Sequence, residues 1–455
     1  MKLIKNLEKL ISNGGTLKNK KGRELVLKTM EEAIKSVLPR NLIKKNIIIK
    51  DQTLIIGNNY INIDLNKVSN IYLIGGGKAS KEMALGLLDI LNDRINAGVI
   101  NIPRGSQTND LTDKKIKFIE TGHPIPTKEG MNGVLKMLEI VEMAKSDDLI
   151  FCLISGGGSA LMPLPANGIT INDLKIMNKI LLGAGMPINE INVLRKHCSK
   201  VKGGQLVMKN KAMFITLIIS DVLNDPLDII ASGPSVPDES TFFEAMNIIK
   251  KYNLENKLPK SILNFIKDGL DGKVLETPKK SDLIFKNVKN YVLGNLNIAC
   301  ESALNYAKKY GIPCKRISSS IEGEASQVGI NLINELSLNK RPIVLIGGGE
   351  TTVTLKGRGK GGRNQELILS AIRKIENEGI IIGAIGTDGI DGNSDAAGAI
   401  ADSSIAEKAK ISSLDINKFL INNDSYNFFK KIGDGLIFTG YTGTNVNDLY
   451  ILVAL

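Results

Sequence analysis

The sequence predicts an α/β protein built from two domains. Short runs of apolar residues recur along the chain and end at glycine-rich loops, and segments long enough for a helix separate the runs. Such runs are typical of strands that a parallel sheet buries on both faces. The length, 455 residues, allows two or three domains at about 150 residues each. An apolar share of 43% is ordinary for a globular chain, which argues against a disordered one.

Five of these runs are expected to be parallel strands in βαβ units, in both halves of the chain. The first three meet the loops GGGKAS, SGGGSA and SDVLND, and the last two meet GGGETT and GTDGIDG. The expected strands are 71–74, 149–154, 214–219, 343–346 and 380–385. Apolar residues at a spacing of three to four predict helices at 80–91, 296–309, 324–336 and 364–376.

The domain boundary is expected in a polar, proline-bearing stretch without a strand pattern, residues 237–281. We therefore predict an N-terminal domain at 1–240, a connecting segment at 241–285 and a C-terminal domain at 286–455. The order of strand, glycine loop and helix recurs in both halves of the chain. We therefore expect ligands to bind at the carboxyl ends of the strands, in a cleft between the two domains.

The charge balance favours a small anionic ligand over nucleic acid. The formal net charge is +12, but aromatic residues make up only 4% of the chain and Trp is absent, so stacking partners for bases are few. The densest basic run, from Lys18 to Arg23, contains no aromatic residue and suits a solvated helix face. We expect no nucleic-acid partner, and a positive field that suits an anionic substrate.

The sequence also predicts a cytoplasmic protein without a membrane segment. The four cysteines form no CxxC pair, so disulfides and a thiolate zinc site are not expected, and burial as small apolar residues is. The first 15 residues contain Lys and Glu among their apolar positions and lack a signal-peptide core. The longest uncharged stretch, 149–172, contains a triple glycine and two prolines and cannot form a spanning helix.

Lys78 stands out among the loop residues. It lies between a triple glycine and a predicted helix start, where its ammonium can reach a phosphate held by backbone N–H groups. The loop differs from a Walker A loop, because position 72 is Tyr and Ala79 replaces the Ser or Thr that would hold magnesium. The alternative is a surface lysine that merely begins a helix.

A second basic loop is GRGKGGRN, residues 357–364. It contains a formal GxGxxG. A dinucleotide fingerprint also requires an acidic residue about twenty positions later, at the end of the next strand, but here the next strand ends at Asp388, about ten positions too late. Arg363 at the helix start suits a polyphosphate better than a ribose hydroxyl. The alternative is an arginine that caps the helix at the surface.

The carboxylates of the loops divide into two groups. Asp221 and Asp388 directly follow apolar strands, where aspartates of phosphoryl-transfer enzymes bind metal ions. Asp391 and Asp395 share a glycine-rich loop and could instead be turn residues, and Glu350 after its triple glycine could be either.

Zinc and serine-hydrolase chemistry are excluded by the remaining motifs. His123 lies between Gly and Pro, His197 lies on a predicted helix, and neither has HxxxH or HExxH neighbours. SGGGSA has the wrong spacing for a nucleophile elbow. Structural or substrate-contact roles remain for both histidines.

Taken in order, nine blocks resemble the motifs of class II glycerate kinases, the MOFRL family. They span residues 72–449 and read GGGKAS, TGHPIPTKEG, LISGGGSALMPLP, LRKHCSKVKGGQL, SDVLNDPLDIIASGP, GGGETTV, GKGGRNQE, GTDGIDGNSDAAGA and TGTNVNDL. The resemblance implies ATP- and Mg²⁺-dependent phosphorylation of D-glycerate to 2-phosphoglycerate. It also implies a Rossmann-like N-terminal domain, a smaller C-terminal α/β domain and an active site between them.

The resemblance also implies roles for individual residues. Lys78, Arg363 and Asp388 become the catalytic residues, and Asp221 and Asp388 become the magnesium ligands. The residues implied to bind substrate or nucleotide are Gly76, Gly77, Ser155, Gly156, Gly157, Gly158, Ser159, Gly349, Glu350, Gly361, Gly362 and Asn364.

Two blocks depart from the family pattern. Leu223-Asn224 stands where Pro-Gly is common, which alters the backbone before Asp225, and Asn393-Ser394 replaces Pro-Thr.

Several alternatives stay open at this point. An NAD(P)-dependent hydroxypyruvate reductase needs a dinucleotide fingerprint and usually a histidine acid, and a glycerate kinase could also give 3-phosphoglycerate. A non-catalytic sensor would not need so many charged loop residues. The expected partners are D-glycerate and ATP, and the number of copies in the assembly, with a homodimer among the candidates, is undetermined.

Overall fold

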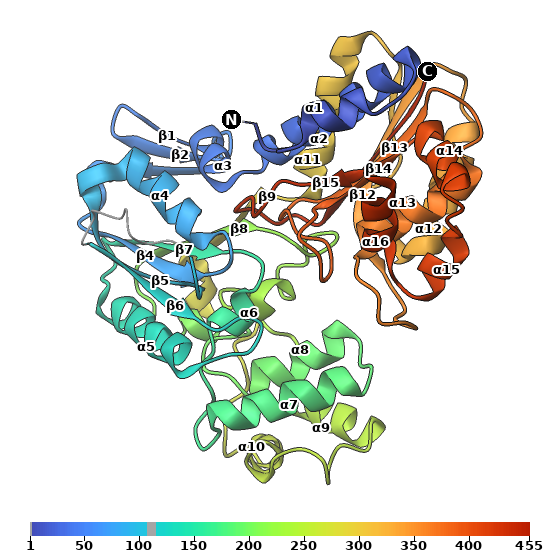
Figure 1. Cartoon of the computed structure of the whole chain (residues 1–455). Coiled ribbons are helices and arrows are strands. Elements are labelled where there is room, and N and C mark those ends of the chain that lie inside the picture. Colours follow the sequence, from blue (N-terminus) through green and yellow to red (C-terminus); the bar gives the residue numbers. More distant parts are fainter. Residues whose placement is uncertain (1, 107–114) are drawn as a thin grey trace. The chain divides into compact units, whose positions relative to one another are not determined.

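The computed structural model of this chain describes residues 2–106 and 115–455 (Figure 1). The chain forms two compact units. Leu42–Leu293 form one, here called the parallel-sheet unit, and Met1–Asn41 together with Gly294–Leu455 form the other, the mixed-sheet unit. The prediction of two α/β domains is therefore confirmed.

The division of the chain differs from the expected one in two respects. The first 41 residues group with the C-terminal half and not with residues 42–240. Residues 241–285, expected as a connecting segment, lie inside the parallel-sheet unit and contain two helices. The first of these begins with a capping box formed by Thr241 and Glu244, a helix-start signal that is readable in the sequence.

The described part of the parallel-sheet unit contains a six-stranded sheet in the order β6-β5-β4-β7-β8-β9. Its first five strands in this order all pair in parallel. A separate antiparallel sheet has the order β1-β2-β3. The strands are β1 (Ile47–Lys50), β2 (Thr53–Ile56), β3 (Ile61–Asp64), β4 (Ile71–Gly76), β5 (Ile95–Pro103), β6 (Ile116–Thr121), β7 (Leu149–Ile154), β8 (Met213–Ile219) and β9 (Val288–Gly294). The parallel strands expected at 71–74, 149–154 and 214–219 are confirmed.

Helices complete two apolar cores in this unit. One core joins α5 to alternate residues of β4 and β7, among them Tyr72 and Ile74. A second core holds α7, α8, α9 and α10 together as a helical layer of their own (Figure 1). The helices are α3 (Pro39–Asn46), α4 (Ser80–Leu91), α5 (Lys128–Met143), α6 (Gly158–Leu161), α7 (Ile171–Gly183), α8 (Ile188–His197), α9 (Phe242–Lys251) and α10 (Lys260–Leu270).

The sheet of the mixed-sheet unit corrects one expectation. In its described residues the order is β10-β12-β16-β13-β14-β15, with β11 also pairing β12. Only β10 and β11 run parallel to β12, whereas β16 lies between β12 and β13 and runs antiparallel to both. The parallel strand expected at 343–346 is confirmed by its pairing with β10 and β11, although its other neighbour β16 is antiparallel. The prediction is wrong for 380–385, whose partners β14 and β16 both run antiparallel to it, because a strand buried on both faces has the same apolar pattern in either direction. The strands are β10 (Cys314–Arg316), β11 (Ile321–Glu324), β12 (Ile343–Thr352), β13 (Ile380–Gly386), β14 (Gly398–Ala401), β15 (Leu436–Ile437) and β16 (Asp448–Ala454).

Helices cover both faces of this sheet. Ile380, Ile382 and Ala384 of β13 pack in one core with α12, α13, α14 and α16. On the opposite face Gly383 meets Val26 and Met30 of α2, so the N-terminal helix covers a sheet formed by the end of the chain. The helices are α1 (Leu7–Ser12), α2 (Leu17–Ser36), α11 (Leu296–Ala307), α12 (Ala325–Ser337), α13 (Arg363–Ala371), α14 (Ser403–Ile411), α15 (Ile416–Ile421) and α16 (Ser425–Ile432).

A buried arginine fastens the N-terminal helices to this unit. Arg23 of α2 is 0% exposed, and its Nε lies 2.7 Å from Asp402 Oδ2 while its Nη1 lies 3.1 Å from Asp434 Oδ1. Nη1 also donates to Leu10 O, at 2.7 Å, and Nη2 to Ser404 Oγ, at 3.1 Å. The expectation that this basic run is a solvated face is wrong for Arg23.

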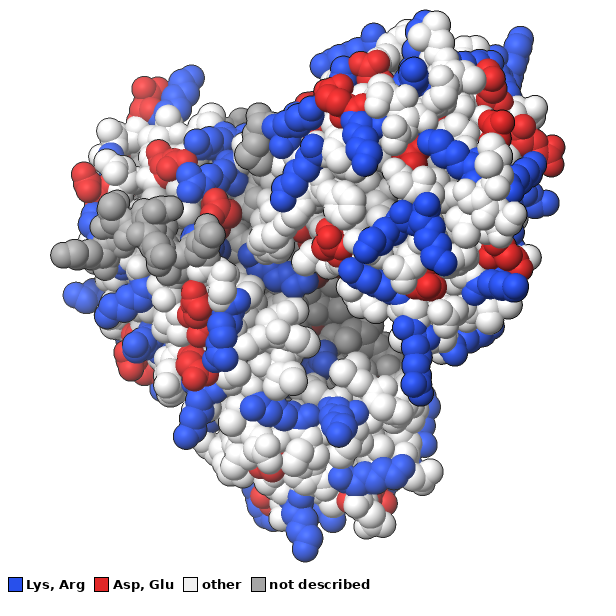
Figure 2. Space-filling model, viewed as in Figure 1, with Lys and Arg blue, Asp and Glu red and all other residues white. Residues whose placement is uncertain are grey.

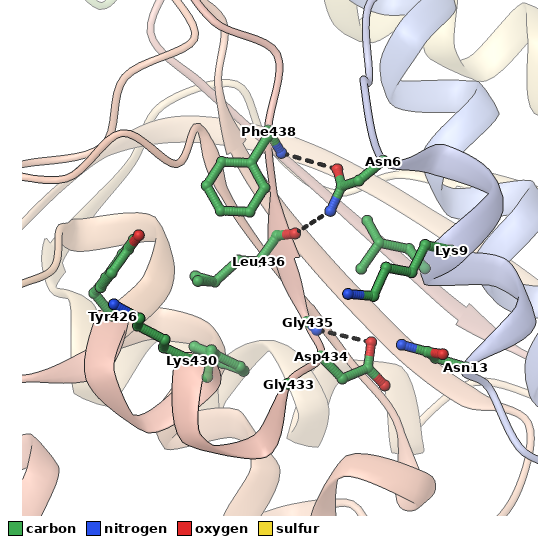
Figure 3. A pocket seen from close by; sticks show the side chains of 12 residues that line it. Asn6, Lys9, Asn13, Tyr426, Lys430, Gly433, Asp434, Gly435, Leu436 and Phe438 are labelled. Atoms are coloured by element: carbon green, nitrogen blue, oxygen red, sulfur yellow. Dashed lines mark hydrogen bonds between the residues drawn. The ribbon is translucent and has the colours of Figure 1, made fainter.

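A pocket of about 280 Å³ lies next to this arginine network (Figure 3). Asn6 lines it, donating through Nδ2 to Leu436 O at 2.8 Å and accepting at Oδ1 from the N–H of Phe438 at 3.1 Å. Lys9 and Lys430 line the same space. The pocket contains none of the residues that the sequence assigns to a site.

The spread of surface charge agrees with the sequence-based expectation, and the expected cysteine burial is confirmed for all but Cys314. On the face seen in Figure 2, basic side chains are spread among acidic ones over the described residues. Cys152, Cys198 and Cys300 are buried free thiols, and Cys314 is a half-buried one. In the part of the chain that the structure describes, every helix is too short or too polar to cross a membrane.

Candidate active site

Two glycine loops meet at the carboxyl end of the parallel sheet. β4 leads into Gly75-Gly76-Gly77-Lys78, and the neighbouring β7 leads into Ser155-Gly156-Gly157-Gly158-Ser159. Gly75 has φ +139°, and a Cβ there would collide with the backbone of Leu153. A Cβ on Gly77 would collide with Ser155 Oγ. These glycines are needed because the two loops touch through their backbones.

Hydrogen bonds join the two loops directly. The N–H of Lys78 donates to Gly156 O at 2.9 Å, and the N–H of Ala79 donates to Ser155 Oγ at 2.9 Å. Ser155 thus satisfies a free N–H at the start of α4 and is 2% exposed. Ser155 therefore positions Lys78, which is half-buried at the start of the helix.

His123 joins Lys78 at this edge of the sheet. Its ring lies against Gly157, where a Cβ would come within 2.8 Å of Nε2. Partial burial and the nearby charge of Lys78 lower the pKa of His123. The neutral imidazole can then accept or donate a hydrogen bond near pH 7. His197, by contrast, is buried, with Nδ1 2.8 Å from Val193 O and Nε2 3.1 Å from Glu276 Oε2, which makes it structural.

Ser159 at the end of the second loop belongs to a buried polar chain. Lys202 Nζ donates to Ser159 O at 2.7 Å and to Ser159 Oγ at 2.9 Å. Ser159 Oγ lies 3.2 Å from Ser232 Oγ, which donates to Asn192 Oδ1 at 2.9 Å. Ala231 and Ser232 have left-handed φ values of 51° and 61°, a strained backbone that recurs at binding sites.

The third loop of this edge follows β8 and contains Asp221, Asp225 and Asp228, all half-buried. Asn224 and Asp225 have φ values of 63° and 53°. Asn replaces the family's glycine at a left-handed position, and asparagine tolerates that conformation better than most residues do. Asn224 therefore fits the left-handed turn before Asp225.

The mixed-sheet unit holds a second group of charged residues. Arg363 begins α13, and its Nε and Nη2 contact Asp448 at 2.6 and 3.2 Å while Nη1 contacts Glu350 at 2.8 Å. These two ion pairs raise the pKa of Arg363 against the opposing effect of burial. Burial raises the pKa of Asp448 to about 7, against the opposing effect of Arg363. Asp448 therefore titrates near neutral pH.

Asp388 lies close to this group. A Cβ on Gly386 would lie 3.4 Å from Asp388 Oδ1 and 3.5 Å from Asp448 Oδ1, so the two carboxylates flank one small space. Asp388 is half-buried and accepts from the N–H of Ile390 at 3.1 Å. Gly349 pairs with Asp448 in the sheet, which places Glu350 at the same edge.

The loop before α13 binds a carboxylate of the protein itself. The buried Asp391 accepts from the N–H groups of Asn364, at 3.1 Å, and Gln365, at 2.8 Å. A Cβ on Gly362 would collide with Asp391, and one on Gly361 with Ser425. Asp391 thus fills the helix N-terminus that a phosphate would occupy in a dinucleotide site. Of the two alternatives for Asp391, the turn and capping role fits; Asp395 is exposed and lies 3.5 Å from Lys360 Nζ.

Each compact unit thus gathers its own part of the predicted set. Lys78, the Ser155–Ser159 loop and Asp221 follow parallel strands of one unit, and Glu350, Arg363 and Asp388 surround one sheet edge of the other. Gly361, Gly362 and Asn364 serve the packing and capping of α13.

Sequence reasoning did not single out Asp448 and Lys202. Asp448 is the first residue of its strand, whereas the carboxylates indicated by the sequence pattern directly follow a strand. Because β16 runs antiparallel, its first residue lies at the same edge as the ends of β12 and β13. Lys202 is one of four Lys and Arg residues in the block LRKHCSKVKGGQL, and no spacing distinguishes it from the other three.

Magnesium needs a carboxylate at one of these edges. Residues 2–106 and 115–455 contain no group of three or more His, Cys, Asp or Glu side chains that could hold a metal ion. Mg²⁺ in kinases is usually held by one or two carboxylates together with substrate phosphates, so such a cluster is not required. The half-buried Asp221 and Asp388 fit that smaller requirement.

Comparisons with known proteins agree with this arrangement. Residues 25–267 match a domain of unknown function (DUF4147), and residues 343–448 match the MOFRL family. The glycerate 2-kinase of Pyrococcus horikoshii is 41% identical, covering 95% of this chain and 97% of that protein. The D-glycerate 2-kinase of Thermotoga maritima is 37% identical, covering 94% and 97%.

A solved structure of a glycerate kinase from Thermotoga maritima matches the fold with a TM-score of 0.83 and 36% identity, over 95% of this chain and 99% of that one. The resemblance inferred from the nine sequence blocks is confirmed. The protein is accordingly an enzyme, a kinase with an alcohol group as acceptor, and the chain belongs to the MOFRL family of glycerate kinases.

Proposed function

We propose that the protein is an ATP- and Mg²⁺-dependent glycerate 2-kinase, which converts D-glycerate to 2-phosphoglycerate. The observation that carries the proposal is similarity over nearly the whole chain to two proteins named glycerate 2-kinases. The buried free cysteines fit a reducing compartment, and we place the reaction in the cytoplasm.

Lys78 is proposed to act on the phosphoryl group. Phosphoryl transfer passes through a loose transition state, so the enzyme contributes mainly positioning and positive charge. Lys78 follows a glycine loop that Ser155 and Gly156 hold by hydrogen bonds, so its ammonium needs little reorganisation. His123 beside it is available as a neutral donor to the substrate.

Arg363 and Asp388 are the proposed catalytic residues of the mixed-sheet unit. Asp448 and Glu350 orient the Arg363 guanidinium, whose side chain keeps 31% exposure and can contact an anion. Of Asp221 and Asp388, the one that does not hold Mg²⁺ accepts the proton of the glycerate hydroxyl. Bound Mg²⁺ would supply positive charge to the nucleotide phosphates, and Asp221 or Asp388 would hold it.

The test is release of ADP from ATP and Mg²⁺ in the presence of D-glycerate, with the product passed to enolase. Direct acceptance by enolase identifies 2-phosphoglycerate. A product that needs phosphoglycerate mutase first would mean that the 3-hydroxyl is the acceptor. Absence of glycerate-dependent ADP, or oxidation of NADH with hydroxypyruvate, would contradict the proposal.

Replacement of Lys78 tests the assignment of the site. Lys78→Ala should lower kcat by about 10²-fold or more, as loss of a preorganised charge does. Lys67→Ala, which removes an exposed lysine of the same unit, is the control. Turnover at the rate of the unmodified protein in Lys78→Ala would remove Lys78 from the mechanism.

A further inference from the structure

Two buried lysines of the parallel-sheet unit differ in the charges around them. Lys196 is 4% exposed, and its Nζ lies 3.3 Å from Asp228 Oδ2 and 3.4 Å from Asp238 Oδ1. Lys202 is 6% exposed, and its Nζ contacts only neutral oxygens, those of Ser159. Among residues 2–106 and 115–455, Lys202 forms no ion pair.

A second cation without a carboxylate lies near Lys202. Arg195 of α8 is half-buried and donates through Nε to Asn178 Oδ1 at 2.8 Å, and it too forms no ion pair with the described residues. Burial and the charge of Arg195 lower the pKa of Lys202 to about 7. Two cations withdrawn from water without an anion are unfavourable. Such a pair is expected where the compensating anion belongs to a ligand.

A chain of hydrogen bonds leads from Lys202 through two serine hydroxyls. Lys202 Nζ donates to Ser159 Oγ, and Ser232 Oγ donates to Asn192 Oδ1. Because the Ser232 proton is used in this way, Ser159 Oγ is the donor to Ser232 Oγ. Ser159 belongs to the glycine loop beside Lys78, so this chain begins at the candidate active site. Ser232, the third residue of this chain, has a left-handed φ of 61°.

We propose that Lys202 and Arg195 bind the carboxylate of the acceptor substrate. This inference rests on the proposed function, in which that substrate is a small hydroxy acid. A planar monoanion suits one guanidinium edge and one ammonium, because Arg can bind a carboxylate through two parallel N–H groups. The Ser159 hydroxyl beside Lys202 suits an alcohol group of the same molecule.

The assignment predicts uptake of a proton on binding. Lys196 is already neutralised by Asp228 and Asp238, so Arg195 is the charge that acts on Lys202. An added carboxylate raises the pKa of Lys202 again, because the opposite charge favours the ammonium. Above neutral pH, binding therefore takes up a proton, and the affinity for the hydroxy acid falls as the pH rises.

Calorimetric titration of the full chain with D-glycerate, glycolate and a non-hydrolysable ATP analogue tests the inference. Lys202→Met should weaken binding of both hydroxy acids by about tenfold to a hundredfold and abolish the proton uptake. Its affinity for the nucleotide should not change. Arg195→Gln should give the same pattern of affinities, and Lys200→Met, an exposed lysine of the same turn, should match the unmodified protein.

Thermal unfolding separates this role from a structural one. Lys202→Met should unfold at the same or a higher temperature near pH 6, because it removes an uncompensated buried charge. Lys196→Met should unfold at a lower temperature, because it leaves Asp228 and Asp238 without their cation. A large loss of stability in Lys202→Met with unchanged glycerate affinity would overturn the inference.

The remaining outcomes are also decisive. Weakened nucleotide binding with intact hydroxy-acid binding would mean that the anion is a phosphate, which contradicts the carboxylate assignment. If the unmodified protein does not phosphorylate D-glycerate but binds glycolate through Lys202, the proposed function fails and the inference stands. If it binds neither acid, both fail.

Discussion

Arg23 and Arg363 lie in the same compact unit, and each holds two carboxylates, yet their surroundings are opposite. Arg23 is 0% exposed, and its nitrogen atoms contact Asp402, Asp434, Ser404 and a backbone carbonyl. The Arg363 side chain keeps 31% exposure and its partner Glu350 keeps 45%. The fully buried ion pairs of Arg23, here called the closed pair, can only hold elements together. The partly exposed ion pairs of Arg363, here called the open pair, leave a guanidinium that can still contact a ligand.

The closed pair explains why the first helices belong to the C-terminal half. Asp402 caps α14 and Asp434 follows α16, so Arg23 joins α2 to two later helices at once. The open pair orders a cation at a sheet edge beside Asp388. Four substitutions, taken from the largest expected effect to the smallest, can break or sharpen this comparison.

Arg23→Met should lower the free energy of unfolding by about 3–5 kcal/mol, because it leaves two buried carboxylates without their cation. Chemical denaturation measures this loss, and Lys21→Met, an exposed neighbour on the same helix, is the control. The kcat of the folded fraction should stay unchanged. A variant as stable as the unmodified protein would contradict the scaffold role.

Arg363→Gln should lower kcat by about 10²-fold, or about 2.7 kcal/mol, because a preorganised charge is lost. Stability should change less than in Arg23→Met, since Asp448, whose pKa is about 7, can take up a proton when its cation is removed. Steady-state kinetics and denaturation together check this split. Arg373→Gln, on the exposed end of the same segment, should be neutral.

Asp448→Asn should change how stability depends on pH. The pKa of Asp448 is raised from its ordinary 3.8 to about 7, so between these values the native state holds a proton that the unfolded state has released. The protonated Asp448 therefore makes its full contribution to the free energy of unfolding below about pH 4. This contribution falls by about 1.4 kcal/mol per pH unit as the pH rises to 7. Denaturation curves at several pH values should lose this component in Asp448→Asn. An unchanged slope would show that Asp448 is ionised throughout.

Glu350→Gln should have the smallest effect. The pair with Arg363 is partly exposed on both sides, and such pairs contribute about 0–1 kcal/mol. A decrease in kcat of about threefold or less is expected, because Asp448 still orients the guanidinium. A decrease as large as that of Arg363→Gln would mean that Glu350 takes part in the reaction itself.

The parts of the fold that depend on local pattern could be predicted. The helix expected at 80–91 is α4, and the three strands of the first half lie where the apolar runs end at glycine. Lys78 follows from the same pattern, because a parallel strand, a glycine loop and a helix place the loop at one edge of the sheet. These features depend on neighbours in the sequence.

Other features depend on partners far along the chain. The sequence of α2 shows an apolar face but not the sheet that buries it, and that sheet lies more than 300 residues later. Asp448 is the first residue of β16, so only the antiparallel pairing of this strand brings it to Arg363. The missing carboxylate beside Lys202 is likewise invisible in the sequence, where Lys196 and Lys202 look alike.

The sequence by itself therefore determined the α/β class, the glycine loops and the family, because each is written in consecutive residues. The tertiary structure decided which buried charges are compensated: Arg23 and Lys196 by aspartates, Arg363 in part, and Lys202 by neutral oxygens alone. The physical reason is that the cost of burying a charge is set by the groups that surround it in space. Those groups come from distant segments, so only the fold distinguishes a structural cation from one that binds a ligand.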